Sequence, residues 1–416
     1  MKVLMIDKYY FVKGGAERYM IELSDILQAN GHEIIPFAMQ HEDNFETPYS
    51  EHFVSNVDYN GLSSKDWPAF LHAAGRMIYS FEAKRRLELL IEKTKPDIAH
   101  LHMIDHQLSP SILHALKKYD VPVIQTVHQY KLVCPNYRLY NPRTGKVCQK
   151  CLSGNMLNPI TEKCHKNSTV AGIAIALEST FHRKTGIYEK NTDIFHVPSH
   201  FMGNKLVEGG VRRDKIRHLF YTIELSHYPP NIVEGDYALF FGRLADEKGI
   251  ITLLKAMEKC PDVPLYIVGG GPQEPVLKKF IADHKLENVK MLGLKSGEEL
   301  QSLVQNCRMV VVPSEWYDNS PLVIYESFAY GKPVIGAKMG GISELIDHEE
   351  NGLHFEAGNI EELTAAMRKL WDDPALAKSY GKAAHEKAER EFDPQVHYEK
   401  IHEWYQEMLH GASVLV

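Results

Sequence analysis

Short apolar runs rich in β-branched residues alternate with amphipathic helical patterns along all 416 residues of this chain. In the first half we predict strands at Val3–Ile6, Glu33–Phe37, Ile98–His102, Val121–Val127, Ile194–Pro198 and Ile216–Phe220, and helices at Ala16–Asn30, Ala69–Thr94 and Pro110–Lys118. In the second half we predict strands at Tyr237–Phe241, Leu265–Val268, Val289–Leu292, Met309–Val312 and Pro333–Ile335, and helices at Gly249–Lys259 and Pro321–Tyr330. This alternation is typical of α/β proteins, in which helices cover both faces of parallel sheets.

The chain is long enough for two domains that each have a hydrophobic core. The segment Tyr221–Gly235 contains two consecutive prolines and lacks periodicity, so it is the predicted linker. We therefore predict two Rossmann-like, doubly wound domains, 1–223 and 224–392, that face each other across a cleft. The segment 393–416 contains a last helical pattern that begins after an Asp-Pro start signal.

Charge and hydropathy exclude several classes of protein. The formal net charge of −7 argues against a nucleic-acid-binding protein, which normally carries a concentrated basic field. The apolar run Val3–Ile6 is too short for a signal peptide. The longest apolar run, near Val170 to Leu177, is too short to span a membrane and suits a buried helix. We expect a cytoplasmic protein that could still touch the inner face of the membrane peripherally.

Two strand-to-helix junctions in the second half carry the clearest chemistry. The first has Arg243 and Lys248 between two glycines, and the second has Asp318 and Glu326 on either side of a helix start at Pro321. In such sheets ligands bind beyond the carboxyl ends of the strands. Cations and a helix N-terminus bind phosphates, and carboxylates accept hydrogen bonds from hydroxyls. These residue types together indicate a site for a diphosphate joined to sugars. The alternatives are solvated surface cations, with Asp318 as a helix cap and Glu326 facing solvent.

Two weaker signals lie in the first half. Gly14 and Gly15 follow the first strand and precede a helix, where a backbone can approach an anion closely. A tight turn without a ligand explains them equally well. His128 ends the strand Val121–Val127, a position that points a polar side chain into the crevice of a parallel sheet. The alternative is a core histidine whose hydrogen bonds are satisfied.

Four of the six cysteines lie in one turn-rich insert, residues 129–168. They are Cys134, Cys148, Cys151 and Cys164. Four thiolates with a central Cys-x-x-Cys suit tetrahedral zinc, so we predict a structural zinc site. Packed free thiols or a redox-sensitive pair remain as alternatives. Cys260 and Cys307 are predicted core residues.

Four motifs occur in order along the chain: Gly14-Gly15-Ala16-Glu17, Asp97 to His102, Gly242 to Gly249, and Asp318 to Glu326. With them the sequence resembles family four of the retaining glycosyltransferases, which have the GT-B fold, over essentially its whole length. The resemblance implies retaining hexosyl transfer from a UDP- or GDP-sugar to a hydroxyl of a glycan or lipid-linked acceptor, in polysaccharide or glycolipid biosynthesis. It also implies that the last helix crosses back onto the N-terminal domain. No Asp-x-Asp pair follows a strand, so we expect no metal cofactor in catalysis.

The resemblance also implies residue roles. Arg243 and Lys248 match residues that bind the donor diphosphate, Glu326 one that binds the ribose, Asp318 one that contacts the donor sugar, and His128 one near the anomeric carbon. The predicted catalytic set is His128, Arg243, Lys248 and Asp318. The predicted donor-binding set is Gly14, Gly15, Gly242, Arg243, Lys248, Asp318, Asn319, Ser320, Pro321, Leu322, Val323 and Glu326.

One departure from the family pattern concerns Asp318, because the family has a glutamate there. Aspartate is one methylene shorter, and Glu315 is a candidate substitute whose spacing to Glu326 differs. The departure leaves two alternatives open: a catalytically weak scaffold with the same fold, or another sugar-nucleotide enzyme such as an epimerase.

Overall fold

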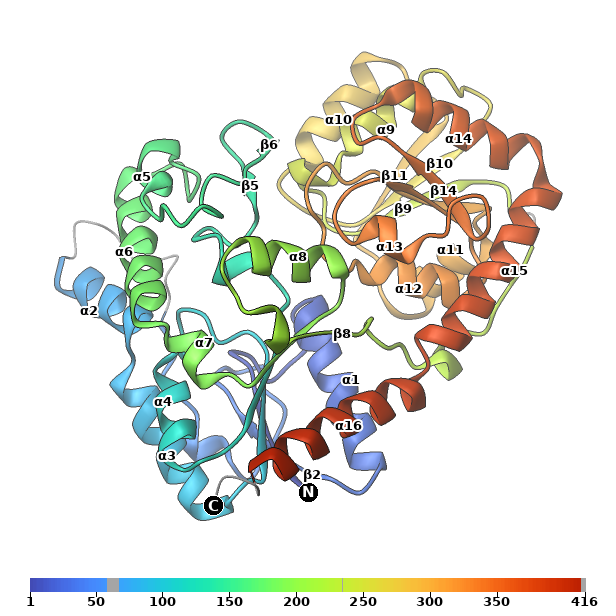
Figure 1. Ribbon diagram of the computed structural model, residues 1–416. Helices are drawn as coiled ribbons and strands as arrows, with labels where there is room; N and C mark the ends of the chain where they lie inside the picture. The colour runs from blue at the N-terminus through green and yellow to red at the C-terminus, as the bar shows by residue number, and fades with distance from the viewer. Residues whose placement is uncertain (58–66, 234, 413–416) are drawn as a thin grey trace. The chain divides into compact units, whose positions relative to one another are not determined.

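The computed structural model describes residues 1–57, 67–233 and 235–412, which form two compact units (Figure 1). The first unit comprises Met1–Arg138, Gln149–Tyr221 and Gln395–Val416, and the second comprises Leu139–Cys148 and Thr222–Pro394. The short segment 139–148 thus groups with the second unit, whereas we placed the whole insert in the first domain. Residue 234 of the predicted linker and the last four residues of the segment 393–416 lie outside the described residues.

The first unit is built on a six-stranded parallel sheet in the order β2-β1-β3-β4-β7-β8. Its strands are β1 (Lys2–Ile6), β2 (Glu33–Phe37), β3 (Ile98–Leu101), β4 (Val123–Thr126), β7 (Ile194–Val197) and β8 (Ile216–His218). The chain runs from β1 to β2 on one side and returns to β3 on the other, with Val3 opposite Ile98. Continuous apolar runs form the central strands because helices cover both faces of a parallel sheet.

The helices of the first unit are α1 (Gly15–Ala29), α2 (Trp67–Ile78), α3 (Phe81–Thr94), α4 (Ser111–Lys118), α5 (Asn158–Glu162), α6 (Thr169–Thr185), α7 (Ile187–Asn191), α8 (His200–Glu208) and α16 (Pro394–Ala412). The helix that we predicted over Ala69–Thr94 is two helices, because the Ser80 side chain accepts a hydrogen bond from the Ala83 N–H and starts α3. The last helix, α16, packs on this unit, where the Tyr405 hydroxyl lies 2.7 Å from His100 Nδ1.

The second unit has a six-stranded parallel sheet in the order β11-β10-β9-β12-β13-β14. Its strands are β9 (Ala238–Phe241), β10 (Leu265–Val268), β11 (Val289–Gly293), β12 (Met309–Val312), β13 (Val334–Ala337) and β14 (Gly352–Phe355). We did not predict β14, whose four residues include a glycine and a histidine. The strand order reverses between β9 and β12, so the loops after these two strands lie at the switch point of the sheet.

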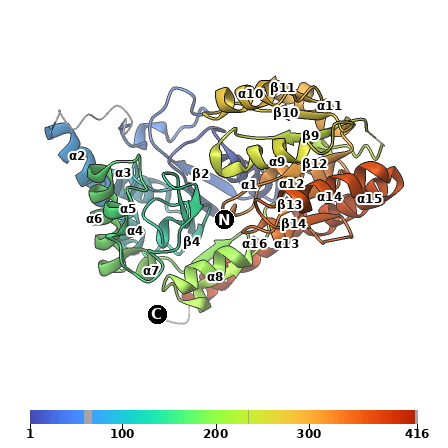
Figure 2. The ribbon, with the colours of Figure 1, turned by 90° about the horizontal axis from the view of Figure 1, so that it is seen from above.

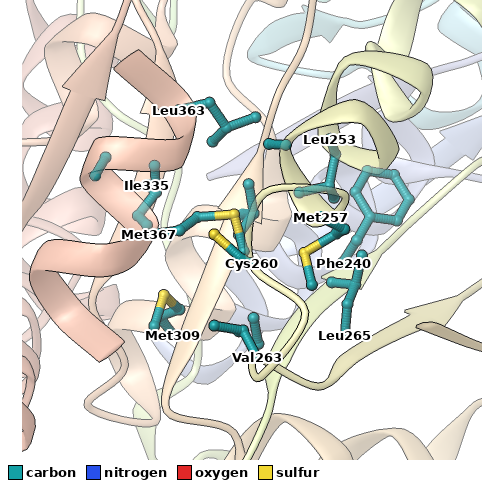
Figure 3. Close-up of a cluster of buried hydrophobic side chains, with 14 of the residues drawn as sticks. Phe240, Leu253, Met257, Cys260, Val263, Leu265, Met309, Ile335, Leu363 and Met367 are labelled. Atoms are coloured by element: carbon teal, nitrogen blue, oxygen red, sulfur yellow. The ribbon is translucent and has the colours of Figure 1, made fainter. Parts of the chain in front are cut away.

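The helices of the second unit are α9 (Ile250–Met257), α10 (Glu274–Asp283), α11 (Gly297–Asn306), α12 (Leu322–Ala329), α13 (Ile342–Leu345), α14 (Ile360–Asp372) and α15 (Pro374–Glu391). A small antiparallel hairpin, β5 (Tyr140–Asn141) and β6 (Lys146–Val147), also belongs to this unit. Leu253 and Met257 of α9 pack with Phe240 in the core (Figure 3). Cys260 lies in this core and Cys307 is also fully buried, as predicted.

None of the helices among the described residues is both long and apolar enough to cross a bilayer. The prediction of a buried helix near Val170 to Leu177 is wrong in its burial. The run forms the first half of α6, and Val170, Ile173 and Leu177 are exposed. The apolar residues of this helix point in two directions, and only one of them faces the core.

Candidate active site

The two predicted donor motifs form one structure at the switch point of the second unit. The loop after β9 contains a short 3-10 helix, Asp246–Lys248, and the Glu315 N–H in the loop after β12 donates to the Glu247 carbonyl at 2.9 Å. Gly249 has a φ of +67°, and a Cβ there would lie 1.9 Å from the Pro313 carbonyl oxygen. Glycine is therefore required at 249, because any side chain would force the two loops apart.

Lys248 and Asp318 are brought together by these loops. The Lys248 Nζ lies 2.5 Å from Asp318 Oδ2, and the Ser314 hydroxyl lies 3.3 Å from the same oxygen. The residue before α12 is Pro321, and no side chain caps that helix. The alternative interpretation of Asp318 as a helix cap is therefore wrong, because its carboxylate holds Lys248 instead.

Arg243 forms an ion pair with Glu247, one turn along the same loop. The Glu247 side chain is almost buried, while that of Arg243 is 52% exposed, so the pair orients the guanidinium without stabilising the fold greatly. Gly242 directly follows β9, and its N–H donates to the Val268 carbonyl at 3.0 Å. Each of the two predicted cations thus has its own carboxylate within the second unit.

Glu315 does not take the place of Asp318. Its carboxylate accepts a hydrogen bond at 2.5 Å from the Thr252 hydroxyl on α9. Asp318, in contrast, contacts Lys248 directly. The geometry therefore favours Asp318 as the first acid of the motif.

The segment from Asn319 to Val323 leads into the N-terminus of α12. Asn319 and Ser320 are buried, and the Ser320 hydroxyl lies 2.6 Å from the Tyr325 hydroxyl, which fixes the approach of the chain to the helix. Leu322 and Val323 are partly exposed at the first turn, where backbone N–H groups have no partner within the helix. Glu326 is also partly exposed and lies on the second turn, as predicted.

The small hairpin supplies a contact that the sequence did not reveal. The buried Tyr140 hydroxyl lies 3.1 Å from Asp246 Oδ2, at the start of the 3-10 helix that carries Lys248. Burial and the Asp246 carboxylate raise the pKa of Tyr140, so its hydroxyl stays a hydrogen-bond donor. A lone tyrosine in a turn-rich segment gives no pattern from which this contact could be predicted.

The corresponding edge of the first unit carries His128, two residues after β4. Its Nε2 lies 3.0 Å from His102 Nδ1, and its Nδ1 lies 2.6 Å from the Tyr221 hydroxyl. Burial lowers the pKa of His128 to about 3, and the nearby His196 and Lys8 add to the effect. His128 is therefore uncharged at neutral pH. Both ring nitrogens have partners, as the alternative of a satisfied histidine expects.

His128 belongs to a larger histidine cluster, which we define as His100, His102, His128, His196 and His397. His100 contacts the Thr126 hydroxyl at 2.7 Å, and the same hydroxyl lies 2.9 Å from His196 Nδ1. The Tyr19 hydroxyl lies 2.9 Å from His397 Nε2. Burial lowers the pKa of His196 to about 4 and that of His397 to about 3, and it lowers the pKa of the other members too. A sequence signal was available, because alternate residues of a strand share one face and His100 and His102 are two apart.

The glycine loop of the first unit lies near a second unusual group. Gly14 precedes α1 and Gly15 begins it. Gly14 is extended, a conformation open to any residue, so backbone strain does not explain this glycine. Asp7, just after β1, is buried and accepts hydrogen bonds from the N–H groups of Tyr9 and Met103. Burial, together with the Glu17 carboxylate, raises the pKa of Asp7 to about 8.

The cysteines of the insert gain no geometric support as a zinc site. In the part of the chain that the structure describes, no three His, Cys, Asp or Glu side chains are grouped so that they could hold a metal ion. Cys134, Cys151 and Cys164 are buried, while Cys148 is partly exposed. The Cys134 thiol lies 3.0 Å from Asn136 Oδ1, and Cys151 accepts from Asn158. Zinc therefore stays a prediction from the sequence, and no step of the chemistry depends on it.

Comparison with known proteins identifies the family. Residues 13–223 match the model for Glycosyltransferase Family 4, and residues 227–387 match the model for glycosyl transferases group 1. The chain is 26% identical over 368 residues to an uncharacterized 42.6 kDa protein in the cps region of Klebsiella pneumoniae, covering 83% of this chain and 87% of that one. It is 24% identical over 419 residues to the glycogen synthase of Mycobacterium tuberculosis, and the match covers 95% of this chain and 92% of that one.

The fold has solved counterparts. The crystal structure of Anabaena Alr3699/HepE in complex with UDP superposes with a TM-score of 0.69 at 18% identity, over 98% of this chain and 100% of that one. This likeness confirms the predicted pair of Rossmann-like domains. The chain therefore belongs to the group 1 glycosyltransferases, in family 4, and has the GT-B fold.

Proposed function

We propose that this glycosyltransferase moves a hexose from a UDP- or GDP-sugar to a hydroxyl of a glycan or lipid-linked acceptor, with retention of configuration at C1. The observation that carries the proposal is the joining of the loops after β9 and β12, which places Lys248, Arg243 and the start of α12 at one edge of the sheet. HepE has been crystallised with UDP and with UDP-glucose, which supports a donor of this class. The names of the relatives, glycogen synthase and a protein of a cps region, support a role in polysaccharide synthesis.

The donor diphosphate replaces carboxylates as the partner of the cations. In the structure Lys248 is paired with Asp318, and Arg243 with Glu247. A diphosphate carries more negative charge than either carboxylate, so it can compete with both of them for the two cations. The N–H groups at the start of α12 add donors and the positive end of a helix dipole.

The chemical step is a substitution at C1 of the donor sugar. The bond from C1 to the diphosphate oxygen breaks, and its electron pair stays on the diphosphate. The acceptor oxygen bonds to C1 from the same side, and its proton passes to the departing diphosphate oxygen. Negative charge grows on the leaving group as the bond breaks, so Lys248 and Arg243 stabilise the transition state more than the bound donor. We assign no step to a metal ion and expect turnover to survive a chelator.

Asp318 and His128 have supporting roles in this proposal. Asp318 positions Lys248 and accepts a hydrogen bond from a hydroxyl of the donor sugar, as the shorter equivalent of the family glutamate. His128 is uncharged at neutral pH because burial lowers its pKa, so it does not repel an oxocarbenium-like centre, and its ring nitrogens keep His102 and Tyr221 as partners. Glu326 holds the ribose hydroxyls.

Incubation with UDP- and GDP-hexoses tests the proposal. We expect slow release of nucleoside diphosphate without an acceptor, and NMR of the first sugar product should show the anomeric configuration of the donor. Inverted configuration would contradict retention. Conversion of the donor to another sugar nucleotide, with no diphosphate released, would indicate an epimerase. Neither release nor nucleotide binding would indicate a scaffold.

A further inference from the structure

Three consecutive aromatic residues follow the first strand of the first unit. Tyr9, Tyr10 and Phe11 lie in the loop after β1, and all three are partly exposed. The centroid of the Phe11 ring lies 4.6 Å from that of the His41 imidazole, and the centroids of Tyr10 and Phe45 are 5.8 Å apart. His41 and Phe45 belong to the loop after β2. Rings from two neighbouring loops thus pack together at the edge of the sheet where the parallel strands end.

Hydrogen bonds hold these two loops together. The Tyr10 N–H donates to the Asn44 side-chain oxygen at 3.1 Å, and the Phe45 N–H donates to the Tyr10 carbonyl at 2.9 Å. The Asn44 amide also donates to the Met39 carbonyl at 2.8 Å. One asparagine side chain therefore bridges the backbone of both loops. The loop that carries Phe45 is held in place before any ligand arrives, which reduces the entropy lost on binding.

A cavity of about 860 Å³ lies along the loop after β2. Its volume falls within the range of small-molecule sites, roughly 300 to 1,000 Å³. Phe45, which is 47% exposed, gives its wall an aromatic surface. Polar side chains that line it are those of Gln40, Asn44, Glu46, Thr47, Ser50 and Glu51. A second cavity of about 420 Å³ shares Gln40 and His41 with the first and adds Glu42 and Asn56. We call the two cavities together the β2 groove.

The polar side chains of the β2 groove suit hydroxyl groups and not anions. Glu42, Glu46 and Glu51 supply carboxylates, and Glu51 is also paired with Lys93. No lysine or arginine is among the described residues that line either cavity. A phosphate or carboxylate on a ligand would therefore meet like charge. A sugar presents hydroxyl donors to such oxygens and packs its apolar C–H face on an aromatic ring, so an uncharged or amino sugar fits the groove.

The β2 groove lies at the same edge of the sheet as His128, but some distance along it. The sheet has the order β2-β1-β3-β4, and the groove follows β2 whereas His128 follows β4. Three strand spacings separate the two places, which is about 14 Å. Strand β2 and the blue chain after it can be followed in Figure 2. A single sugar ring is too short to reach both places, whereas an oligosaccharide can span them.

From these observations we infer that the β2 groove binds the acceptor glycan several sugars away from its reacting hydroxyl, and that this acceptor is an uncharged or amino-sugar oligosaccharide. The inference rests on the proposed function, because it takes a glycan as the acceptor. It adds the length and the charge of that acceptor. The groove holds the distant sugars through Phe45 and the side-chain oxygens, and the reacting end of the glycan is left free to lie near His128.

Binding of the full-length protein to an oligosaccharide array tests this inference. The array carries neutral, amino-sugar and uronic-acid chains of graded length. We expect affinity for neutral or amino-sugar chains that rises with length, and little for single sugars or uronic-acid chains. Phe45→Ala should weaken binding of the best chain by about tenfold, because it removes the exposed ring of the groove. Phe81→Ala, at a 78% exposed phenylalanine of α3 in the same unit, is the matched control.

A charge reversal gives a second test that leaves the aromatic rings in place. Glu46→Lys should improve binding of uronic-acid chains relative to neutral chains by about fivefold, because a cation replaces one carboxylate of the groove. Glu287→Lys, at an exposed residue of the second unit, is its control. With the best chain as acceptor, Phe45→Ala should raise the KM for that chain and leave kcat and donor hydrolysis unchanged. A loss of kcat at the same melting temperature would contradict a binding site distant from the reaction.

Several results of the array would overturn the inference. They are absence of binding to every neutral and amino-sugar chain, stronger binding of uronic-acid chains, or an equal loss in Phe45→Ala and Phe81→Ala. Titration of UDP and GDP separates this inference from the proposed function. Nucleotide binding without binding of any chain would count against the groove alone. Binding of chains without binding of either nucleotide would leave the groove as a glycan site and contradict the proposed transfer.

Discussion

The two units have the same kind of sheet, yet the side chains at their candidate functional edges differ in charge. In the second unit, Lys248 and Arg243 are each held by a carboxylate on adjoining loops. In the first unit, the equivalent edge holds the histidine cluster, whose members burial keeps uncharged. The edge of the second unit thus has cations whose carboxylate partners an anionic ligand can replace. The edge of the first unit has titratable side chains that burial keeps neutral.

This difference suits the two halves of a glycosyl transfer. A leaving diphosphate needs fixed positive groups, and ion pairs keep such groups oriented before the donor arrives. In the proposed reaction the sugar carbon develops positive charge, and a neutral imidazole would not repel it. The same α/β framework can therefore support opposite electrostatics, because the loops after the strands, and not the strands, carry the chemistry.

The largest effect should come from removing a cation of the second unit. Lys248→Ala and Arg243→Ala should each lower turnover by on the order of a hundredfold or more, from lost stabilisation of the leaving group. Lys259→Ala is a matched control, since Lys259 is exposed and pairs with Glu361 at the surface. Initial rates with a UDP- or GDP-hexose measure the effect. Near-normal turnover in both cation variants would contradict the claim that the cations of the second unit stabilise the leaving group.

The histidine cluster should make the first unit sensitive to acid. The folded-state pKa of each member is lowered, so between pH 6.5 and 4 the unfolded chain binds more protons than the folded one, and the free energy of unfolding falls as pH falls. The loss should reach up to about 2 kcal/mol per histidine between pH 7 and 5. Asp7 acts in the opposite sense, because its pKa is raised and its contribution is lost as pH rises toward 8.

Urea unfolding at a series of pH values measures this sensitivity. His397→Gln should flatten the dependence between pH 7 and 5, because glutamine cannot titrate. His410→Gln is the control, since that histidine lies near the end of α16 outside the cluster. A slope that is unchanged in His397→Gln would show that the cluster does not resist protonation.

A moderate effect on nucleotide affinity should follow from a change in the second unit alone. Glu326→Gln should weaken binding of the nucleoside diphosphate by about tenfold, because a ribose diol uses two acceptor oxygens and an amide offers one. Glu361→Gln, at an exposed residue of α14, is the control. Calorimetry that gives equal affinity for the Glu326 variant and the unmodified protein would refute the ribose role.

The smallest effect should come from the hairpin contact. Tyr140→Phe keeps the buried ring but loses the hydrogen bond to Asp246, so Lys248 is positioned less precisely. Turnover should fall by about threefold with unchanged melting temperature, since a single hydrogen bond to a charged group contributes modestly. Tyr119→Phe, at a tyrosine of the first unit that contacts Glu92 on the surface, is the control. An equal response in both variants would mean that the hairpin does not position the donor loop.

The sequence was sufficient for features set by local pattern. The predicted strands Leu265–Val268 and Met309–Val312 match the structure residue for residue, because buried parallel strands are short apolar runs. The proximity of Lys248 to Asp318 was predictable for a different reason. Both residues follow parallel strands, and ligand-binding loops gather where the strand order reverses. Strand order, and not local sequence, makes them neighbours.

Features set by tertiary contacts were not predictable in the same way. The break at Ser80 depends on one capping hydrogen bond inside a continuous helical pattern. The prediction that α6 is buried was wrong, because this helix has more apolar residues than one core-facing side can hold. Only the structure shows which of them are exposed to solvent. The histidine cluster joins residues from three strands or their ends and from α16, so no local pattern contains it.

The central claim is that the second unit binds a nucleoside diphosphate through its paired cations. Calorimetric titration of UDP and GDP into the unmodified protein, Lys248→Ala and His128→Ala tests it most directly. We predict binding of one of the two nucleotides with one site per chain, loss of most of that affinity in Lys248→Ala, and nearly unchanged affinity in His128→Ala. Absence of binding for both nucleotides, or equal affinity in Lys248→Ala and the unmodified protein, would contradict the claim.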